Sequence, residues 1–169
     1  FLGLLALPIL ILIPSSRRRL FQVPKPSPGQ IWIHGASLGE HRAISGLETQ
    51  IGEHHWRTYS SFRTPIPRAW PAPFDVPFFF RNWLKKARPS MLILIESEWW
   101  PGWLYHVHKE GIPIVCCNAR EGKTSKRYRQ LGLWGWATSK MTLLNQNDTG
   151  DLKLDAPQRK SPLTLNGNW

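Results

Sequence analysis

One carboxylate, Glu40, ends a short apolar segment and a glycine-containing turn in residues 31–40, which read IWIHGASLGE. The pattern predicts a strand over residues 30–34 and a helix from Glu40 to about residue 51. In open α/β folds, ligands bind outside the carboxyl ends of the strands, at turns of this kind. A carboxylate there can act as a general base on a hydroxyl group. Ser37 and Glu40 also fit a capping box, in which both side chains bond free helix amides. The local sequence leaves both roles open.

Two further carboxylates, Glu96 and Glu98, directly follow the apolar run of residues 91–95. A continuous run of this length predicts a strand buried on both faces of a parallel sheet. Residues at i and i+2 point to the same side while the chain stays extended. Both would lie in the crevice beside Glu40 if the two strands are neighbours. The alternative is that they cap the next helix and pair with basic side chains.

A third polar group, residues 118–120 (Asn-Ala-Arg), follows the apolar run of residues 112–117. Arg120 could bind a phosphate or pair with one of the glutamates. The following residues predict a basic helix over 125–138, which is either solvated or faces lipid phosphates. The histidines lack metal-ligand spacing, and no Gly-x-Ser-x-Gly elbow is present, so we predict neither a metal site nor a serine hydrolase.

The composition limits the class of partner. The formal net charge of +11 over 169 residues predicts attraction to polyanions, which include nucleic acid, anionic lipid and phosphorylated substrates. Charge alone does not choose among them. The ten tryptophans suit membrane interfaces, sugar-binding surfaces or a core. The two cysteines, Cys116 and Cys117, are adjacent, which argues against a disulfide framework and for a reducing compartment.

The amino-terminal segment is almost wholly apolar over residues 1–13, and three arginines follow it at 17–19. We predict a membrane anchor with a basic flank over residues 1–20, and the basic residues would place the next domain on the cytoplasmic side. Because roughly 20 residues are needed to span a bilayer, the segment would be the end of a longer helix. A buried helix is the alternative. Prolines in 21–29 predict an extended linker.

The order of elements predicts the fold class. Helices are expected over residues 77–88 and 100–110, and a last short strand over 141–144. The proline-containing stretch 52–76 is expected to be irregular. Strands that alternate with helices imply βαβ units, so residues 30–155 are predicted to form an α/β domain with a Rossmann-like parallel sheet and flanking helices. Residues 156–169 would form a tail.

Several of these segments together resemble one family, the 3-deoxy-D-manno-octulosonic acid (Kdo) transferases of lipopolysaccharide core biosynthesis. Five segments occur in the family's order: residues 34–40, 74–77, 96–101, 118–120 and 149–155. The resemblance implies a GT-B glycosyltransferase, of which this chain is the N-terminal, acceptor-binding half. On this resemblance, the second GT-B domain, which holds most of the donor site, would be missing after residue 169. This sequence departs from the family at Gly102, where Asn is usual, and at Asp151, where Asn or Ser is usual.

The resemblance also implies a reaction. The family moves Kdo from the donor CMP-Kdo to the lipid A precursor (lipid IVA), at the cytoplasmic face of the bacterial inner membrane. The enzyme would be inverting and metal-independent, and it would need no cofactor. Carried over by motif, Glu40 would be the general base and Glu98 a second catalytic residue. The positions expected to bind substrate are Ser37, Gly39, Glu96, Arg120 and Lys153.

Without the donor half, this chain alone is expected to be inactive. Two alternatives to a Kdo transferase stay open. The first is a catalytically inactive, truncated homologue that holds anionic lipid at the membrane surface through tryptophans and basic residues. The second is nucleic-acid binding, which rests on the charge alone, and we expect no nucleic-acid partner.

Overall fold

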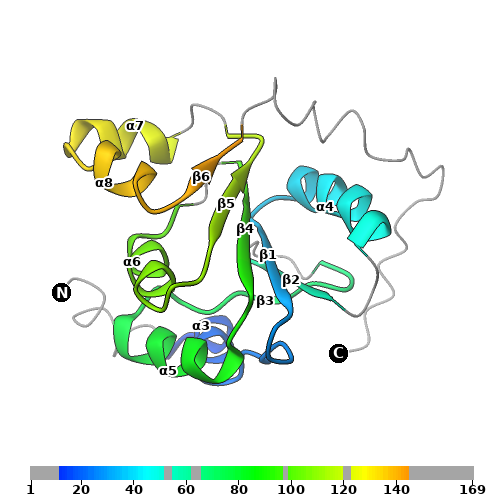
Figure 1. Cartoon of the computed structure of the whole chain (residues 1–169). Coiled ribbons are helices and arrows are strands. Elements are labelled where there is room, and N and C mark those ends of the chain that lie inside the picture. Colours follow the sequence, from blue (N-terminus) through cyan, green and yellow to red (C-terminus); the bar gives the residue numbers. More distant parts are fainter. Residues whose placement is uncertain (1–11, 52–54, 62–65, 97–98, 120–122, 145–169) are drawn as a thin grey trace.

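Six parallel strands form one sheet in the order β3-β2-β1-β4-β5-β6 (Figure 1). The computed structural model describes residues 12–51, 55–61, 66–96, 99–119 and 123–144. The order runs outward from β1 in both directions, as in the doubly wound Rossmann arrangement. The strands are β1 (Ile31–Gly35), β2 (Trp56–Ser60), β3 (Trp70–Pro71), β4 (Met91–Ile95), β5 (Ile114–Cys117) and β6 (Thr142–Leu143).

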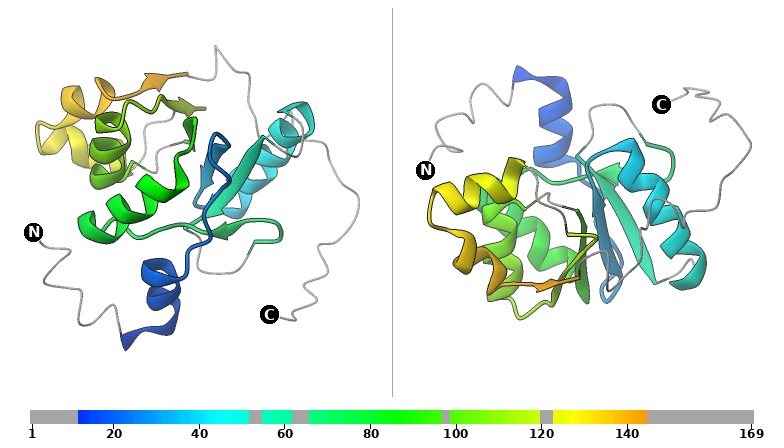
Figure 2. Two further views of the ribbon diagram at one scale, coloured as in Figure 1. Left: turned by 60° about the horizontal axis from the view of Figure 1, so that its bottom comes forward. Right: turned by 90° about the horizontal axis from the view of Figure 1, so that it is seen from above.

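Helices lie on both sides of the sheet, so the predicted Rossmann-like α/β fold is confirmed (Figure 2). Helix α4 covers one face, and α5 and α6 cover the other, with α3 packed against α5 and α8 against α7. The helices are α3 (Pro14–Phe21), α4 (Leu38–Ile51), α5 (Pro77–Ala87), α6 (Pro101–Lys109), α7 (Lys123–Gln130) and α8 (Trp134–Thr138).

Aromatic side chains fill the core between the sheet and α5 and α6. The ring of Trp32 on β1 lies within 6.0 Å, between centroids, of Tyr59, Phe80, Trp83 and Trp103. A smaller cluster around Ile33 and Ile44 fills the α4 side. Burial of this much aromatic surface is the main source of stability for the domain. Among the described residues, the buried tryptophans are therefore core residues: Trp32, Trp56, Trp83, Trp99 and Trp103.

The sequence predicted that the stretch 52–76 is irregular. This prediction was wrong for the described part of the stretch, which contains β2 and β3. β2 pairs with β1 along its whole length, from Ile31↔Trp56 to Gly35↔Ser60. The five residues of β2 do not alternate between buried and exposed side chains, since Arg57 is exposed and the other four are buried. β3 is two residues long and lies at the sheet edge, where Pro71 costs no ladder hydrogen bond.

The other predicted elements are present, with one division. The helix predicted over 125–138 is split into α7 and α8, because Gly132 adopts the left-handed conformation with φ of 67°. Helices α5 and α6 begin at prolines, and Gly111 (φ of 73°) ends the turn after α6. These positions match the predicted helix limits within two residues.

The amino-terminal part differs from a simple anchor and linker. No helix in the described part of the chain is long and apolar enough to cross a membrane, and residues 1–11, most of the predicted anchor, lie outside the described residues. The arginine-containing segment forms α3. In the predicted linker, the Pro24 carbonyl accepts hydrogen bonds from the Tyr59 hydroxyl (2.9 Å) and from Trp83 Nε1 (3.2 Å). This segment therefore packs against the domain.

Candidate functional site

The strand order makes the carboxyl ends of β1 and β4 the switch point of the sheet, because the later strands are added on the opposite side of β1 from β2 and β3. The two strands are hydrogen-bonded neighbours in the register His34↔Leu94. The turn that carries Glu40 and the residue after β4, Glu96, therefore leave the same edge of adjacent strands. We expected Glu40 and Glu96 to lie near each other if their strands were neighbours, and the strands are neighbours. Such switch points are the usual ligand sites of open α/β folds.

Glu40 lies at the start of α4 and is 6% exposed. Its carboxylate accepts hydrogen bonds from the Ala36 backbone N–H at Oε2 (2.7 Å) and from the Ser37 hydroxyl at Oε1 (2.8 Å). The Ser37 Oγ in turn accepts from the Glu40 N–H (3.2 Å). Ser37 thus occupies the N-cap position before Leu38 and bonds the Glu40 amide, as predicted. The Glu40 carboxylate instead bonds the Ala36 N–H, one residue before the N-cap, so the second half of the predicted capping box is replaced by a bond to the turn. Gly39 follows as the second helical residue and is half-buried.

Two residues at the neighbouring strand ends have left-handed backbone. Glu96 follows β4 with φ of 64°, and Asn118 follows β5 with φ of 54°. They are side by side, because Ile95 and Cys117 are register partners. Asparagine tolerates this conformation, whereas glutamate adopts it at an energetic cost. Strained backbone of this kind clusters at functional sites, and here it lies at the same edge as Glu40.

A buried hydrogen-bond chain supports the segment after β4. The Cys116 thiol donates to the Glu96 carbonyl (2.7 Å), and Trp99 Nε1 donates to Cys116 Sγ (3.3 Å). The Tyr128 hydroxyl of α7 donates to the Trp99 carbonyl (3.1 Å). Burial raises the pKa of the Cys116 thiol to about 12, so the thiol keeps the proton it donates. Neither Cys116 nor Tyr128 was predicted from the sequence to support the site.

Asp75 lies in the segment 74–77, for which no role was predicted from the sequence. Its Oδ2 accepts a hydrogen bond from the Gly102 N–H (2.9 Å) in the first turn of α6. Burial raises the pKa of the Asp75 carboxyl, and the Gly102 and Trp103 amides oppose that shift. A carboxylate at a helix N-terminus binds free amides and complements the helix dipole. Asp75 therefore fixes the start of α6 from a distant segment.

This contact makes a prediction about Gly102. A β-carbon there would collide with Asp75 Oδ1. We expect Gly102→Ala to destabilise the domain by about 1–2 kcal/mol, because displacing a buried hydrogen-bonded carboxylate costs more than the roughly 1 kcal/mol that alanine gains in a helix. Urea unfolding of the chain measures the difference.

Gly135 in α8 supplies the matched control. A β-carbon at Gly135 meets no atom within 4 Å, so Gly135→Ala should leave stability equal or slightly higher. A Gly102→Ala variant that is as stable as the original chain would show that Asp75 can move without cost.

His34, near the carboxyl end of β1, is completely buried on the α6 side of the strand. Its ring lies edge-on to Trp103, with centroids 4.8 Å apart. Burial lowers its pKa to about 3, and repulsion from Arg19, and from His41 when that ring is protonated, acts in the same direction. His34 is therefore neutral at physiological pH. Among the described residues, no group of three His, Cys, Asp or Glu side chains is placed to hold a metal ion.

Three of the predicted site residues lie outside the described residues: Glu98, Arg120 and Lys153. The structure brings together Ser37, Gly39, Glu40 and Glu96 at one edge of the sheet. It adds Asn118, Asp75 and the hydrogen-bond chain from Tyr128. These additions depend on contacts between distant segments, which no local pattern signals.

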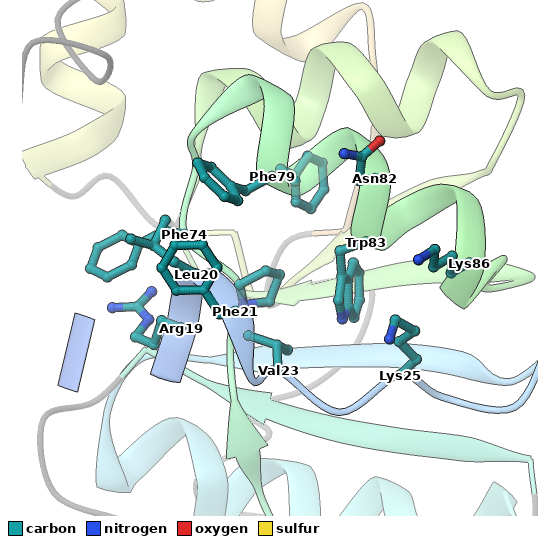
Figure 3. A pocket seen from close by; sticks show the side chains of 12 residues that line it. Arg19, Leu20, Phe21, Val23, Lys25, Phe74, Phe79, Asn82, Trp83 and Lys86 are labelled. Carbon is teal, nitrogen blue, oxygen red and sulfur yellow. The ribbon is translucent and has the colours of Figure 1, made fainter. Parts of the chain in front are cut away.

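A separate hollow of about 180 Å³ lies between α3, α5 and the segment before β1 (Figure 3). Three basic side chains, Arg19, Lys25 and Lys86, contribute to its lining. Arg19 stacks on the Phe74 ring at 4.1 Å from the centroid, and its Nε donates to the Ala72 carbonyl (2.8 Å). Asn82 and a set of mostly aromatic apolar residues complete the lining: Leu20, Phe21, Val23, Pro73, Phe74, Phe79, Phe80 and Trp83. The hollow therefore combines apolar walls with positive charge.

Comparison with known proteins identifies the family of the chain. The family model of 3-deoxy-D-manno-octulosonic-acid transferases (Kdo transferases) matches residues 15–156. The chain is similar to the 3-deoxy-D-manno-octulosonic acid transferase of Haemophilus influenzae, with 25% identity over 99% of this chain and 44% of the relative. It is similar to the Bordetella pertussis enzyme of the same name, with 26% identity over 88% of this chain and 43% of the relative.

A shorter match joins the chain to the Rickettsia bellii protein of that name, with 31% identity over 53% of this chain. The chain spans less than half the length of each of these curated relatives. The matched residues include the Glu40 turn, the strained strand ends and the Asp75 contact alike. This chain belongs to the Kdo transferase family and corresponds to its N-terminal half.

Proposed function

We propose that this chain is the acceptor-binding half of a Kdo transferase and that Glu40 is its general base. The reaction would transfer Kdo from CMP-Kdo to the lipid A precursor, lipid IVA, in lipopolysaccharide core biosynthesis. A GT-B enzyme would complete the donor site with a second Rossmann-like domain. The chemistry would be inverting and would need neither a metal nor a cofactor.

One observation carries the proposal. Glu40 is a buried carboxylate at the switch point of the sheet, fixed by Ala36 N–H and by Ser37 O–H. An acceptor hydroxyl needs a positioned base to become a nucleophile, and this is where an open α/β fold binds its ligand. The same carboxylate bonds the turn and the N-cap side chain that precede α4. We infer that the acceptor takes over this carboxylate as it enters, so that these bonds and proton transfer alternate.

Glu96 is proposed to act beside Glu40 in binding the acceptor. It leaves β4 next to β1, and its left-handed backbone is held by the Cys116 thiol and by its own N–H bond to the Cys117 carbonyl (2.9 Å). Glu98 is proposed as the second catalytic carboxylate, two residues further along. Arg120 and Lys153 are proposed to bind phosphate or carboxylate groups of the substrates, since both side chains are positively charged and these groups are negatively charged.

The hollow beside α3 favours a second function, the binding of anionic lipid at a membrane surface. It offers Arg19, Lys25 and Lys86 to phosphate and aromatic walls to acyl chains. Such a surface would orient the chain at the cytoplasmic face of the bacterial inner membrane. In an active enzyme it serves the acceptor. In a catalytically inactive homologue it would be the whole function.

A fusion protein separates the two functions. In it, this chain replaces the corresponding N-terminal part of the Haemophilus influenzae relative, and CMP release from CMP-Kdo is measured with lipid IVA as acceptor. We expect CMP release by the fusion and none by the chain alone. Both proteins should bind vesicles that contain lipid IVA. A fusion that folds and binds lipid IVA without releasing CMP would overturn the enzymatic proposal and leave lipid binding.

A further inference from the structure

We propose that His41 is a positioning residue for Glu40, acting through the peptide unit that joins Gly35 and Ala36. The proposal concerns how the carboxylate is held, and its catalytic meaning rests on the proposed function of Glu40. His41 belongs to none of the site positions inferred from the sequence. It follows Glu40 directly in α4, yet its ring reaches back to the end of β1.

The geometry joins the two residues through one rigid plane. His41 Nε2 lies 3.1 Å from the Gly35 carbonyl oxygen. The N–H on the other side of that peptide bond, at Ala36, donates to Glu40 Oε2 at 2.7 Å. The carbonyl and the N–H belong to one planar peptide unit, so they cannot turn independently. A bond that fixes the carbonyl therefore also aims the N–H at the carboxylate.

The packing around Gly35 brings the imidazole to this carbonyl. A β-carbon at position 35 would lie 3.3 Å from His41 Nε2 and 3.0 Å from Ile44 Cδ1, closer than ordinary contact. Glycine is therefore the residue that lets the ring approach. The His41 side chain is 8% exposed, so water does not readily replace it as a donor.

The protonation state agrees with this role. Burial lowers the pKa of His41, and the bond to the Gly35 carbonyl opposes the shift. A neutral imidazole carries its hydrogen on the nitrogen that faces an acceptor, so a carbonyl at Nε2 assigns the hydrogen to Nε2. His41 is thus a donor at neutral pH. The other polar contact of this carbonyl, from the Ser61 N–H, is longer at 3.3 Å.

Loss of the His41 donor should free the Gly35–Ala36 peptide to rotate. The Ala36 N–H would then leave Glu40 for part of the time, and its amide hydrogen would exchange faster with solvent. A purely structural role would instead loosen the whole sheet. The two cases differ at a control amide in the neighbouring strand, such as that of Leu94, which pairs with His34.

Amide hydrogen exchange of the 169-residue chain, measured by NMR, tests this. In His41→Phe, which keeps a ring without the donor, we expect the Ala36 amide to exchange about tenfold faster or more, with Leu94 unchanged. In His41→Gln, whose side-chain nitrogen reaches the position of Nε2, the Ala36 rate should stay within about threefold of the original. If His41→Phe does not fold, His41→Asn replaces it, because its amide is too short to reach Gly35.

Two results would overturn the proposal. One is an unchanged Ala36 rate in the variant that lacks the donor. The other is an equal acceleration at Ala36 and Leu94, which would make His41 a general core residue. In the fusion enzyme, the donor-free variant should lower kcat while KM stays the same, and His41→Gln should restore kcat. Because the exchange experiment needs no catalysis, its failure is distinguishable from failure of the proposed transferase function.

Discussion

Replacing Glu40 by glutamine is expected to lower kcat for Kdo transfer in the fusion enzyme by about 10²–10⁴-fold, the usual contribution of a general base. Glutamine has nearly the same shape, and its Oε1 can still accept a hydrogen bond from the Ala36 N–H. It cannot take a proton from the acceptor hydroxyl. The rate of CMP release at saturating lipid IVA measures the loss, and vesicle binding should stay within about twofold because glutamine keeps the shape of the glutamate side chain.

Glu110→Gln is the matched control for this result. Glu110 is exposed at the end of α6, at the opposite edge of the sheet from Glu40, so the same chemical change there should leave transfer unaltered. The unfolding midpoint of Glu40→Gln also needs to be measured, because the carboxylate holds the Ala36 N–H and the N-cap residue Ser37 before α4. A variant that transfers Kdo at the original rate would remove Glu40 from the mechanism. A slow variant that has also lost stability would point to this structural role alone.

The parts of the fold that were predicted correctly have local signals. Residues 91–95 form an unbroken apolar run, and Pro101 and Gly111 mark the limits of α6 because each suits one end of a helix. The turn at Glu40 was located for the same reason, since an apolar strand, a Ser N-cap and a helical pattern follow one another within ten residues. The bond from the Glu40 N–H to Ser37 Oγ is one that this spacing requires, whereas the carboxylate reaches the Ala36 N–H, which the spacing did not predict.

The missed parts depend on contacts that form only in the packed structure, most of them between residues far apart in the sequence. β2 has a weak pattern of its own and becomes a strand because β1 offers it a complete ladder. The Asp75 contact spans 27 residues, and Tyr128 reaches Trp99 across 29. His41 was missed because its ring serves a carbonyl six residues back, at the start of the turn. Contacts of this kind depend on the packed structure, so no sequence spacing predicts them.

The burial of His34 has a consequence for stability in acid. Its pKa is 6.5 in the unfolded chain and about 3 in the folded protein, mainly because burial opposes the charged form. The full stability of the folded protein with respect to His34 is present above pH 6.5, where the histidine is neutral in both the folded and the unfolded chain. As the pH falls below that value, only the unfolded chain binds the proton, so stability is lost until the folded pKa is reached. Each pH unit in this window costs about 1.4 kcal/mol, or roughly 3–5 kcal/mol in total.

His34→Leu should remove this dependence, because leucine fills a similar volume against Trp103 and does not titrate. Urea unfolding at pH 7.5, 6, 5 and 4 measures it. We expect the variant to be about 1 kcal/mol less stable at pH 7.5, through the lost ring contact, and more stable than the original chain at pH 4. His41 is present in both proteins, so its own titration cancels in the difference. His108→Gln, at an exposed position of α6, should keep the original pH dependence. Parallel curves for His34→Leu and the original chain would mean that His34 is protonated in the fold as readily as in the unfolded chain, against the burial seen here.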